Sequence, residues 1–541
     1  MTATAVPELR YGVDRLVTRG RRVFGWGWAA HPAQSIAAIT LAVKGNGWEA
    51  QLPVNHGLAR DDVKAAFPVL VNGRSSGFVV TGYVPDVPIR ELTLEVKLDD
   101  GTIASIDVTG AMETRSVGHR KLREARWLAR AVLRRMRQGD FRGILRRAKS
   151  QNYGAPSLDS VAIVANLLPR LKTSSGVTLV FDHNMGGGAN IYRRAVIDER
   201  LAKGRTVLLC TYNLPTLDYR LHVFAPGANE QIFRLSSFVV LEWVLAKAPV
   251  DELFLNSPVS FDEPLLFAEW LATMRALHPK TRLVVAAHDY ITVCPSFVLL
   301  NADGRYCGIP EISECATCLK RHRASYLTLS PPTEIGPWRA LWGRCLAVAD
   351  EVRCFSESTR RLLLRAYPAL DVGRISVVPH RVDYVPARRP TPDHGAPLVV
   401  GIIGHISAQK GALVVKELVG VIERERRDIR VVVIGTLDAA PDSPRLVVTG
   451  NYRREDLPGL IEAHRINLFF FPSICPETFS YVIEEMMLLG LPVVAFDLGA
   501  PGERLRSYGA ARLVSDTSAR AALAALVDYH EQLAATQTTP A

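Results

Sequence analysis

The sequence predicts an α/β protein in which an all-β domain precedes two parallel sheets. Up to about residue 111, short stretches of β-branched and aromatic residues alternate with Gly, Asn, Pro and Asp, which is typical of a small β-sandwich. Further on, two regions show short apolar runs separated by segments of helical periodicity, the pattern of parallel α/β units. A stretch rich in Pro and Arg, residues 377–397, lies between these regions and predicts a hinge between two sheets.

We place the domain boundaries where the pattern changes. A β-sandwich accessory domain spans residues 1–111, and a basic helical linker spans residues 112–150. The first parallel sheet occupies residues 151–385, and the second occupies residues 386–541. The chain has 541 residues, of which 48% are hydrophobic, so each domain has enough apolar side chains for a core.

The composition of the chain indicates the compartment in which the protein is expected. No apolar run reaches the length of a transmembrane helix, and the first ten residues lack the basic and apolar regions of a signal peptide. Eight cysteines in so long a chain do not make the disulfide framework of a secreted protein. We therefore expect a cytoplasmic protein.

The excess positive charge is concentrated in one segment. The chain carries a net charge of +11, and residues 113–149 contain thirteen Lys or Arg against three acidic residues, which leaves a local charge of +10. Apolar residues of this segment fall on one helical face, and such basic helices bind anionic membrane surfaces. We therefore expect the protein to lie on the inner face of the cytoplasmic membrane. The alternative is an interdomain linker whose apolar face packs on its neighbours. Nucleic acid is not an expected partner, because no nucleic-acid-reading motif accompanies the charge.

One stretch, residues 468–505, carries the clearest prediction of a ligand site. The apolar run Leu468–Phe471 predicts a buried strand, and after a loop apolar residues recur at helical spacing until Gly490. A second buried strand follows. The loop therefore lies at the carboxyl end of a parallel strand, where such sheets bind ligands. Thr478 is the expected N-cap, and Phe479 opens the helix.

Two carboxylates, Glu477 and Glu485, flank the start of this helix. At about 1.5 Å per residue they lie roughly 10 to 12 Å apart, with the free amides of the first helical turn between them. A helix N-terminus suits a diphosphate, and each carboxylate can accept hydrogen bonds from sugar hydroxyls. The hexose, diphosphate and ribose of a nucleotide sugar match this layout. The alternative is that both glutamates are solvated charges on a helix surface.

With the Pro-Glu-Thr-Phe-Ser turn before the helix and Gly-Leu-Pro-Val-Val after it, the stretch resembles the E-x7-E signature of retaining GT-B glycosyltransferases of sequence family 4. The resemblance implies two Rossmann-like domains that face each other across a cleft. It also implies transfer of a hexosyl or deoxyhexosyl group from a nucleotide-sugar donor to an acceptor hydroxyl, with retention of configuration and without a catalytic metal. In this resemblance Glu477 is catalytic and binds the donor sugar, Glu485 binds the ribose, and Phe479 and Ser480 line the donor site.

Two glycine-bearing loops resemble further parts of that family's donor site. Gly187 and Gly188 follow the first predicted strand of the middle domain and resemble the Gly-Gly-Ala loop that faces the diphosphate and acceptor. In the last domain a strand runs into Gly404, and Lys410 follows six residues later. This spacing resembles the family's diphosphate loop, with Lys410 as the cation that binds phosphate.

Three further side chains are candidates for the site. His405 stands where relatives usually have Arg, and a histidine is only partly charged near neutral pH, so Arg453 is a second cation that can assist. His288 ends another predicted strand, where site residues concentrate. The resemblance places His288 against the donor sugar as a catalytic residue, and a histidine satisfied within the core is the alternative.

Four cysteines lie within 25 residues of the middle domain, in a loop spanning residues 294–318: Cys294, Cys307, Cys315 and Cys318. Two of them are spaced C-x-x-C, and four thiolates match the ligand demand of a tetrahedral structural zinc. Free thiols, an iron–sulfur cluster and disulfides are the alternatives at this point.

These elements together predict a glycosyltransferase of bacterial surface polysaccharide biosynthesis, of which O-antigen synthesis is an example. The setting depends on residues 57–68, which resemble a recurrent element of accessory domains that precede bacterial polysaccharide glycosyltransferases. The expected partners are a nucleotide-sugar donor and a lipid-linked glycan acceptor. Two other classes stay open: a catalytically idle glycan-binding or scaffold subunit, and a nucleotide-sugar epimerase with the same two-sheet architecture.

Overall fold

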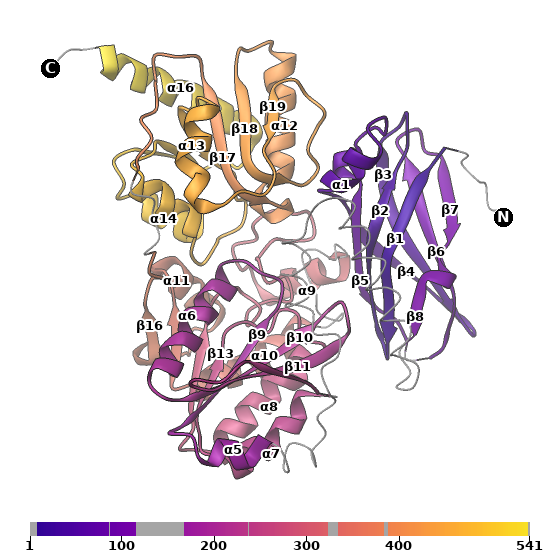
Figure 1. Ribbon diagram of the computed structural model, residues 1–541, viewed down its shortest axis with the longest axis vertical. Helices are drawn as coiled ribbons and strands as arrows, with labels where there is room; N and C mark the ends of the chain where they lie inside the picture. Colours follow the sequence, from indigo (N-terminus) through magenta and orange to yellow (C-terminus); the bar gives the residue numbers. More distant parts are fainter. Residues whose placement is uncertain are drawn as a thin grey trace.

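The computed structural model describes residues 8–85, 87–114, 167–235, 237–322, 334–382 and 388–538, and three sheets organise them (Figure 1). An eight-stranded sheet at the N-terminus is followed by an eight-stranded and a six-stranded sheet. Figure 1 shows the two α/β domains one above the other, with the β-domain alongside both. The predicted fold class, a GT-B pair of α/β domains after an all-β domain, is confirmed.

The β-domain folds one continuous sheet over a single core. Its strands follow the order β7-β6-β3-β4-β5-β2-β1-β8, and the described strands pair antiparallel except for β1 with β8. Strand β4 joins the two halves, because residues 48–53 pair with β3 and residues 54–58 pair with β5. Apolar residues of both halves, such as Leu41 and Val80, meet in the core of this β-sandwich. The elements are β1 (Arg10–Arg19), β2 (Arg22–Ala30), β3 (Ile36–Gly45), β4 (Trp48–Leu58), α1 (Asp61–Ala66), η1 (Gly73–Ser75), β5 (Gly77–Tyr83), β6 (Ile89–Leu98), β7 (Ile103–Asp107), η2 (Thr109–Ala111) and β8 (Met112–Thr114).

The middle domain contains a parallel sheet with an antiparallel edge. Its strand order is β12-β11-β10-β9-β13-β14-β15-β16, and β11 and β12 form an antiparallel edge that the sequence analysis did not predict. Strand β9 is buried along its whole length, because helices cover both faces of a parallel sheet. The elements are α5 (Leu168–Lys172), β9 (Val177–His183), α6 (Gly188–Ala202), β10 (Thr206–Asn213), β11 (Asp218–Phe224), β12 (Gln231–Leu235), η4 (Phe238–Leu241), α7 (Glu242–Lys247), β13 (Val250–Leu255), α8 (Pro264–Leu277), β14 (Arg282–Ala286), α9 (Ile312–Arg321), α10 (Ile335–Val348), β15 (Glu351–Cys354), α11 (Glu357–Ala366), η5 (Val372–Arg374) and β16 (Ile375–Val377).

The C-terminal domain is built on a fully parallel sheet. Its described strands follow the order β19-β18-β17-β20-β21-β22, and helices α12 and α16 pack together beside the sheet. The elements are β17 (Val399–Ile406), η6 (Ala408–Lys410), α12 (Ala412–Arg424), β18 (Arg430–Leu437), β19 (Leu446–Val448), η7 (Arg454–Asp456), α13 (Leu457–Ala463), β20 (Leu468–Phe471), α14 (Tyr481–Leu488), β21 (Val493–Phe496), α15 (Gly499–Leu505), β22 (Ala511–Val514) and α16 (Ala519–Thr538).

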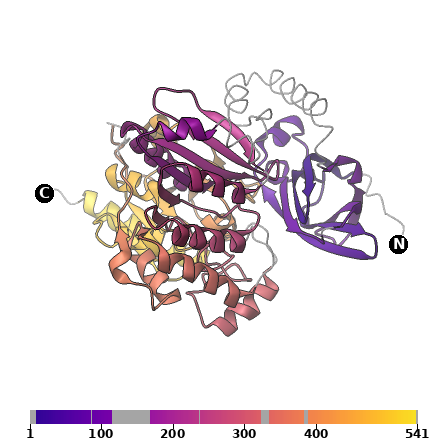
Figure 2. The ribbon, with the colours of Figure 1, turned by 90° about the horizontal axis from the view of Figure 1, so that it is seen from below.

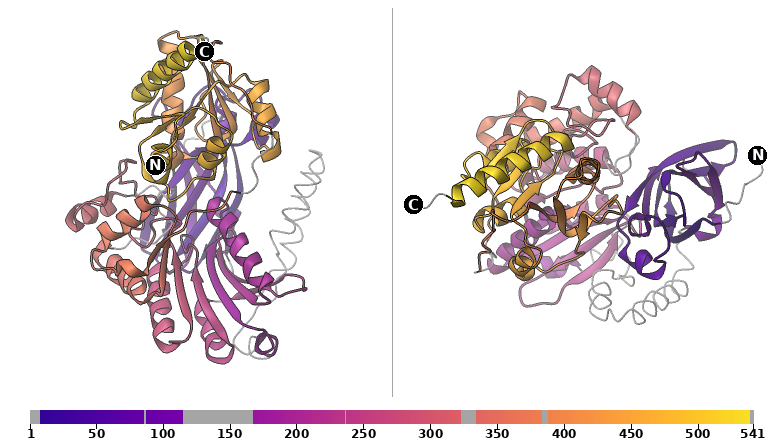
Figure 3. Two further views of the ribbon diagram at one scale, coloured as in Figure 1. Left: turned by 90° about the vertical axis from the view of Figure 1, so that its left-hand side faces the viewer. Right: turned by 90° about the horizontal axis from the view of Figure 1, so that it is seen from above.

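The two α/β domains touch each other directly, both through loops that follow their strands and through helices α11 and α15. The hydroxyl of Thr478 donates a hydrogen bond of 2.9 Å to the carbonyl oxygen of His288. The carboxylate of Glu503 accepts hydrogen bonds from the backbone N–H groups of Glu357 and Ser358, at 3.0 and 2.5 Å. Figure 2 shows the β-domain attached to one side of this pair, and Figure 3 shows helices on both sides of the middle sheet.

The structure corrects the expected start of the helix after β20. Helix α14 begins at Tyr481 rather than Phe479, and its N-cap is Ser480, whose hydroxyl accepts a hydrogen bond from the N–H of Ile483. Thr478 is not the cap, because its hydroxyl is used in the contact with the middle domain.

The basic segment expected to bind a membrane lies almost entirely outside the described residues, since only residues 113 and 114 of it are described. In the described part of the chain, no helix combines the length and the apolar character needed to cross a bilayer.

Candidate active site

The two loops expected to bind a diphosphate lie against the first turn of α14. Gly411 has φ +85°, and a Cβ there would lie 2.0 Å from the carbonyl oxygen of Pro472, so only glycine allows this approach. From the middle domain, Gly188 comes so near to α14 that a Cβ would lie 3.2 Å from the ring of Tyr481. Gly187 precedes it with φ +85°. The structure therefore brings one predicted glycine loop to α14 and the other to the loop that leads into α14.

Glu485 is buried in α14, with 5% of its surface exposed, and carries an ion pair. The guanidinium of Arg454 lies 3.2 Å from its carboxylate. Burial, together with the charge of Glu485, raises the pKa of neighbouring Tyr452 to about 12. The structure does not bring Arg453 into this group, because its side chain is 76% exposed and pairs with Glu455. Arg454, which the sequence analysis did not select, is the cation at this position.

Glu477 presents an oxygen without a partner in the loop before α14. Its Oε1 atom is buried and makes no hydrogen bond within the described residues, while its backbone carbonyl accepts from the N–H of Ala500 at 2.8 Å. Burial raises the pKa of nearby Cys475 to about 12; the charge of Glu477 raises it further and the charge of Lys410 lowers it. Glu477 and Lys410 therefore lie close to the same thiol, and Lys410 forms no ion pair with a described carboxylate.

His288 lies at the end of the predicted strand, on the middle-domain side of the cleft. Its ring stacks on Phe355 with centroids 4.3 Å apart, and its Nε2 atom is buried without a partner in the described structure. Loss of hydration lowers the pKa of His288 well below its usual value, and the nearby cationic forms of His380, His183 and Arg353 lower it further. The imidazole is therefore neutral at neutral pH.

His380 is a candidate site residue that the sequence analysis missed. Its Nδ1 atom shares a hydrogen bond of 2.9 Å with the hydroxyl of Tyr481, and its ring stacks on Phe479 at 4.4 Å and on Tyr192 at 4.7 Å. Burial lowers the pKa of His380 to about 3, and its Nε2 atom has no partner among the described residues. The signal for it was a histidine just after an apolar run, within the first residues of the predicted hinge stretch.

Three buried polar atoms near the contact between the α/β domains have no protein partner in the described structure: Glu477 Oε1, His288 Nε2 and His380 Nε2. The rings of His288 and His380 have centroids 5.3 Å apart, and Thr478, next to Glu477, bonds to the backbone of His288. Buried polar atoms normally have hydrogen-bond partners, so these unpaired atoms indicate a site where a polar ligand can bind.

Gly404 and His405 sit at the end of β17. Gly404 has φ +115° and approaches Val482 of α14, in keeping with the expected loop. His405 is exposed and shares a hydrogen bond with the hydroxyl of Thr436 on the neighbouring strand. Asp438 follows on the same strand, and the charge of His405 acts on its carboxyl group. His405 thus lies at the rim of the site.

The four predicted zinc ligands lie near enough to one another to interact electrostatically. Cys315 and Cys318 are on α9, and burial with the charges of the other three thiols raises the pKa of Cys294 to about 12. Cys318 accepts a hydrogen bond from the N–H of Ala302 at 3.3 Å. Within the described ranges, no group of three or more His, Cys, Asp or Glu side chains is arranged to hold a metal ion, these cysteines included. The zinc assignment stays a prediction.

Comparison with protein families points to the C-terminal domain. Residues 397–532 match the model of a family described as glycosyl transferases group 1. A curated relative, alpha-maltose-1-phosphate synthase of Mycolicibacterium smegmatis, is 29% identical over 214 residues, which cover 32% of this chain and 53% of the relative. The chain thus spans about half the length of the curated relative it matches.

Solved structures give matches over a larger part of the chain. Sucrose-phosphate synthase from Thermosynechococcus elongatus is 15% identical, with a TM-score of 0.42, and the match covers 67% of this chain and 94% of that one. Anabaena HepE in complex with UDP-glucose is 15% identical, with a TM-score of 0.40, and covers 66% and 94% of the two chains. The family match, residues 397–532, covers the region that holds Glu477, Glu485 and Lys410.

Proposed function

We propose that this chain is a retaining glycosyltransferase that moves a sugar from a nucleotide-sugar donor to a glycan acceptor. The observation that carries the proposal is the arrangement at the start of α14. There Glu485 is buried against Arg454, Glu477 offers an unpaired oxygen, and Lys410 lies beside them without an ion pair in the described structure.

The nucleotide end of the donor fits the groups around Glu485. A carboxylate accepts hydrogen bonds from the two hydroxyls of a ribose, and Arg454 fixes this carboxylate in place. The diphosphate then meets the N-terminus of α14, the ammonium of Lys410 and the glycine backbone around Gly411. Gly187 and Gly188 allow the middle domain to approach the same diphosphate.

The sugar end fits the unpaired atoms in the cleft. Neutral His288 and His380 exchange hydrogen bonds with sugar hydroxyls, because a neutral imidazole both donates and accepts. The carboxylate of Glu477 binds the sugar and stabilises the positive charge that develops on it as the bond to the diphosphate breaks. Lys410 and the helix N-terminus stabilise the negative charge of the leaving diphosphate, so the proposal assigns no catalytic metal.

We further place the reaction in bacterial surface polysaccharide synthesis, on a lipid-linked acceptor at the inner face of the cytoplasmic membrane. The support is the basic segment of residues 113–149, whose thirteen cations and apolar stripe fit an anionic bilayer surface.

Purified protein incubated with UDP-, GDP-, ADP- and dTDP-sugars tests the proposal. Release of free nucleotide that rises on addition of a bacterial membrane lipid extract, with a product of unchanged anomeric configuration by NMR, is the expected result. The Glu477→Ala variant serves as the control for background hydrolysis. An epimerised donor sugar instead identifies an epimerase, and donor or glycan binding without turnover identifies an idle subunit.

A further inference from the structure

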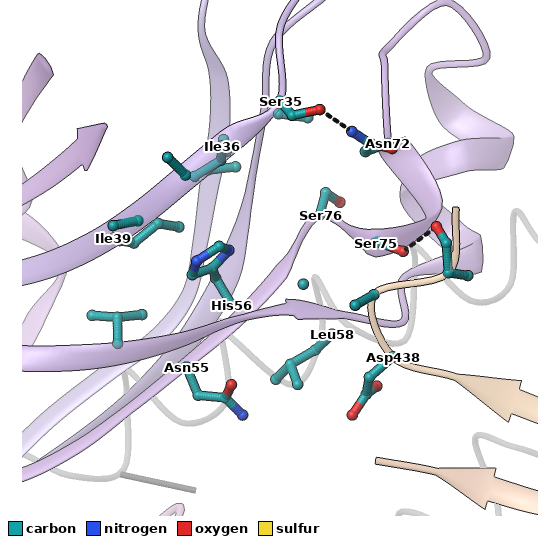
Figure 4. Close-up of a pocket in the computed structure, with 18 of the residues that line it drawn as sticks. Ser35, Ile36, Ile39, Asn55, His56, Leu58, Asn72, Ser75, Ser76 and Asp438 are labelled. Carbon is teal, nitrogen blue, oxygen red and sulfur yellow. Dashed lines mark hydrogen bonds between the residues drawn. The ribbon is translucent and has the colours of Figure 1, made fainter. Parts of the chain in front are cut away.

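A cavity of about 1090 Å³ lies between the β-domain and the C-terminal domain (Figure 4). On one side it is bounded by β3, β4 and the turn around η1 of the β-domain. On the other side it is bounded by η6, the start of α12 and the loop after β18. None of the unpaired cleft atoms described above belongs to its lining. A cavity of this volume is large enough to hold a ligand that contains several rings.

Three hydrogen bonds hold the walls of this cavity together. The N–H of Ala439 donates to the carbonyl of Gly57 at 2.6 Å, and the N–H of Ala59 donates to the carboxylate of Asp438 at 3.2 Å. The hydroxyl of Ser75 donates to the carbonyl of Ala440 at 3.2 Å. The cavity is therefore a preformed space with fixed walls.

The lining offers hydrogen-bonding groups that the protein leaves unused. The Oε1 atom of Gln34 is buried and has no partner within the described residues, and the side-chain amide of Asn55 makes no hydrogen bond there. His56 projects from β4 toward the centre of the cavity (Figure 4). Burial lowers the pKa of His56, a hydrogen bond with the backbone of Ala37 opposes this shift, and the charge of Lys416 lowers the pKa further. The ring is therefore neutral at neutral pH, and one of its two nitrogens is already bonded to the protein. The cavity therefore presents acceptors and donors side by side.

Charge and apolar surface narrow the chemistry of the ligand. The lining holds one ammonium, that of Lys416, against the carboxylates of Asp99, Asp438 and Asp442, so a strongly anionic ligand is disfavoured. Leu413 and Val71 face the cavity and expose 59% and 38% of their surfaces. A neutral ligand with many hydroxyls and apolar C–H faces satisfies both kinds of lining, and a pyranose chain has this character.

The cavity also shares a wall with the proposed donor site. Ala408 and Ala412 line it, and between them in the sequence lie Lys410 and Gly411, which we assign to the diphosphate. We propose that this cavity is an oligosaccharide subsite that holds part of the glycan acceptor beside the reaction centre. The inference rests on the proposed glycosyltransferase function, and it gives the β-domain a role in binding the acceptor.

Binding of neutral tetrasaccharides to the full chain tests this inference. Maltotetraose, cellotetraose, chitotetraose and mannotetraose are titrated by saturation-transfer NMR, and a heparin tetrasaccharide is the anionic comparison. Leu413→Trp and Val71→Trp fill the cavity from opposite walls, and Leu277→Trp, at a 66% exposed leucine at the end of α8, is the matched control. All three sites are exposed, so the variants are expected to fold.

We expect at least one neutral tetrasaccharide to bind the wild type, and both filled variants to bind it at least about tenfold more weakly. The Leu277→Trp variant should bind like the wild type, and the heparin fragment should not bind. Absence of binding by every neutral probe up to about 10 mM, or equal binding by the filled variants, overturns the inference. Nucleoside diphosphate titrations on the same samples separate the oligosaccharide subsite from the donor site. If the wild type does not bind nucleotide, this contradicts only the proposed donor site.

Discussion

Replacing Glu485 by alanine tests the proposed ribose contact most sharply. The carboxylate is 5% exposed and held by Arg454 at 3.2 Å, so it is fixed before the donor binds. A hydrogen bond to a charged group contributes about 1.5 to 3 kcal/mol, and about 1.4 kcal/mol corresponds to a tenfold change in affinity. Losing the ribose contact should therefore weaken binding of the nucleoside diphosphate roughly 10- to 100-fold.

The measurement is isothermal titration calorimetry with the nucleoside diphosphate of the donor that the wild type turns over. Glu484→Ala is the matched control, because Glu484 is the adjacent residue of the same helix and pairs with Arg504 at 2.6 and 2.9 Å instead. Glu484→Ala should bind nucleotide like the wild type. Unchanged affinity in Glu485→Ala, or equal loss in both variants, would refute the assignment of the ribose to Glu485.

Four further outcomes are expected. Glu477→Ala should lower turnover at least about tenfold with little change in donor affinity, and steady-state kinetics showing the opposite split would reject its role at the sugar. The pKa of His380 is lowered from about 6.5 to about 3, so on acidification the unfolded chain binds the proton before the folded protein does, and the free energy of unfolding falls as the pH drops below about 6.5. In urea titrations, His380→Phe should lose roughly 2 kcal/mol less of its free energy of unfolding between pH 7 and 5 than the wild type. An equal loss in the variant and the wild type would contradict the burial of a neutral His380. Elemental analysis should find about one zinc per chain, lost in Cys315→Ser and in Cys318→Ser with reduced stability, and a metal-free protein that is folded and active would disprove the structural zinc. Residues 113–149 should bind anionic but not neutral vesicles and release them near 1 M salt, where the screening length is about 3 Å; equal binding to both vesicle types would favour the linker interpretation.

The sequence was most informative where one continuous stretch of residues contains both a strand and the site residues that follow it. Strands β9 and β20 are buried on both faces and are mainly apolar, so their positions and the loops after them could be predicted. Glu477 and Glu485 belong to one such stretch, although only Glu485 lies on the helix, because α14 begins at Tyr481. The N-cap was assigned two residues early, because the interdomain bond of Thr478 has no local signal.

The parts that could not be predicted depend on contacts between distant segments. His380 becomes a site residue only because Tyr192, Phe479 and Tyr481 surround it, and these come from α6 and from the region of α14. Arg454 rather than Arg453 reaches Glu485, because η7 begins at Arg454 and orients its side chain toward that carboxylate. Two adjacent arginines cannot be told apart in this respect from the sequence. The cavity beside the β-domain likewise exists only once two separate domains are docked.

A crystal structure of the protein with the nucleotide sugar that it turns over would show directly whether the donor occupies the proposed site. We expect the ribose hydroxyls on the carboxylate of Glu485 and the diphosphate between Lys410 and the first turn of α14. The sugar should lie within hydrogen-bonding distance of Glu477, His288 and His380. A nucleotide bound elsewhere, or a ribose without contact to Glu485, would contradict the proposed donor site.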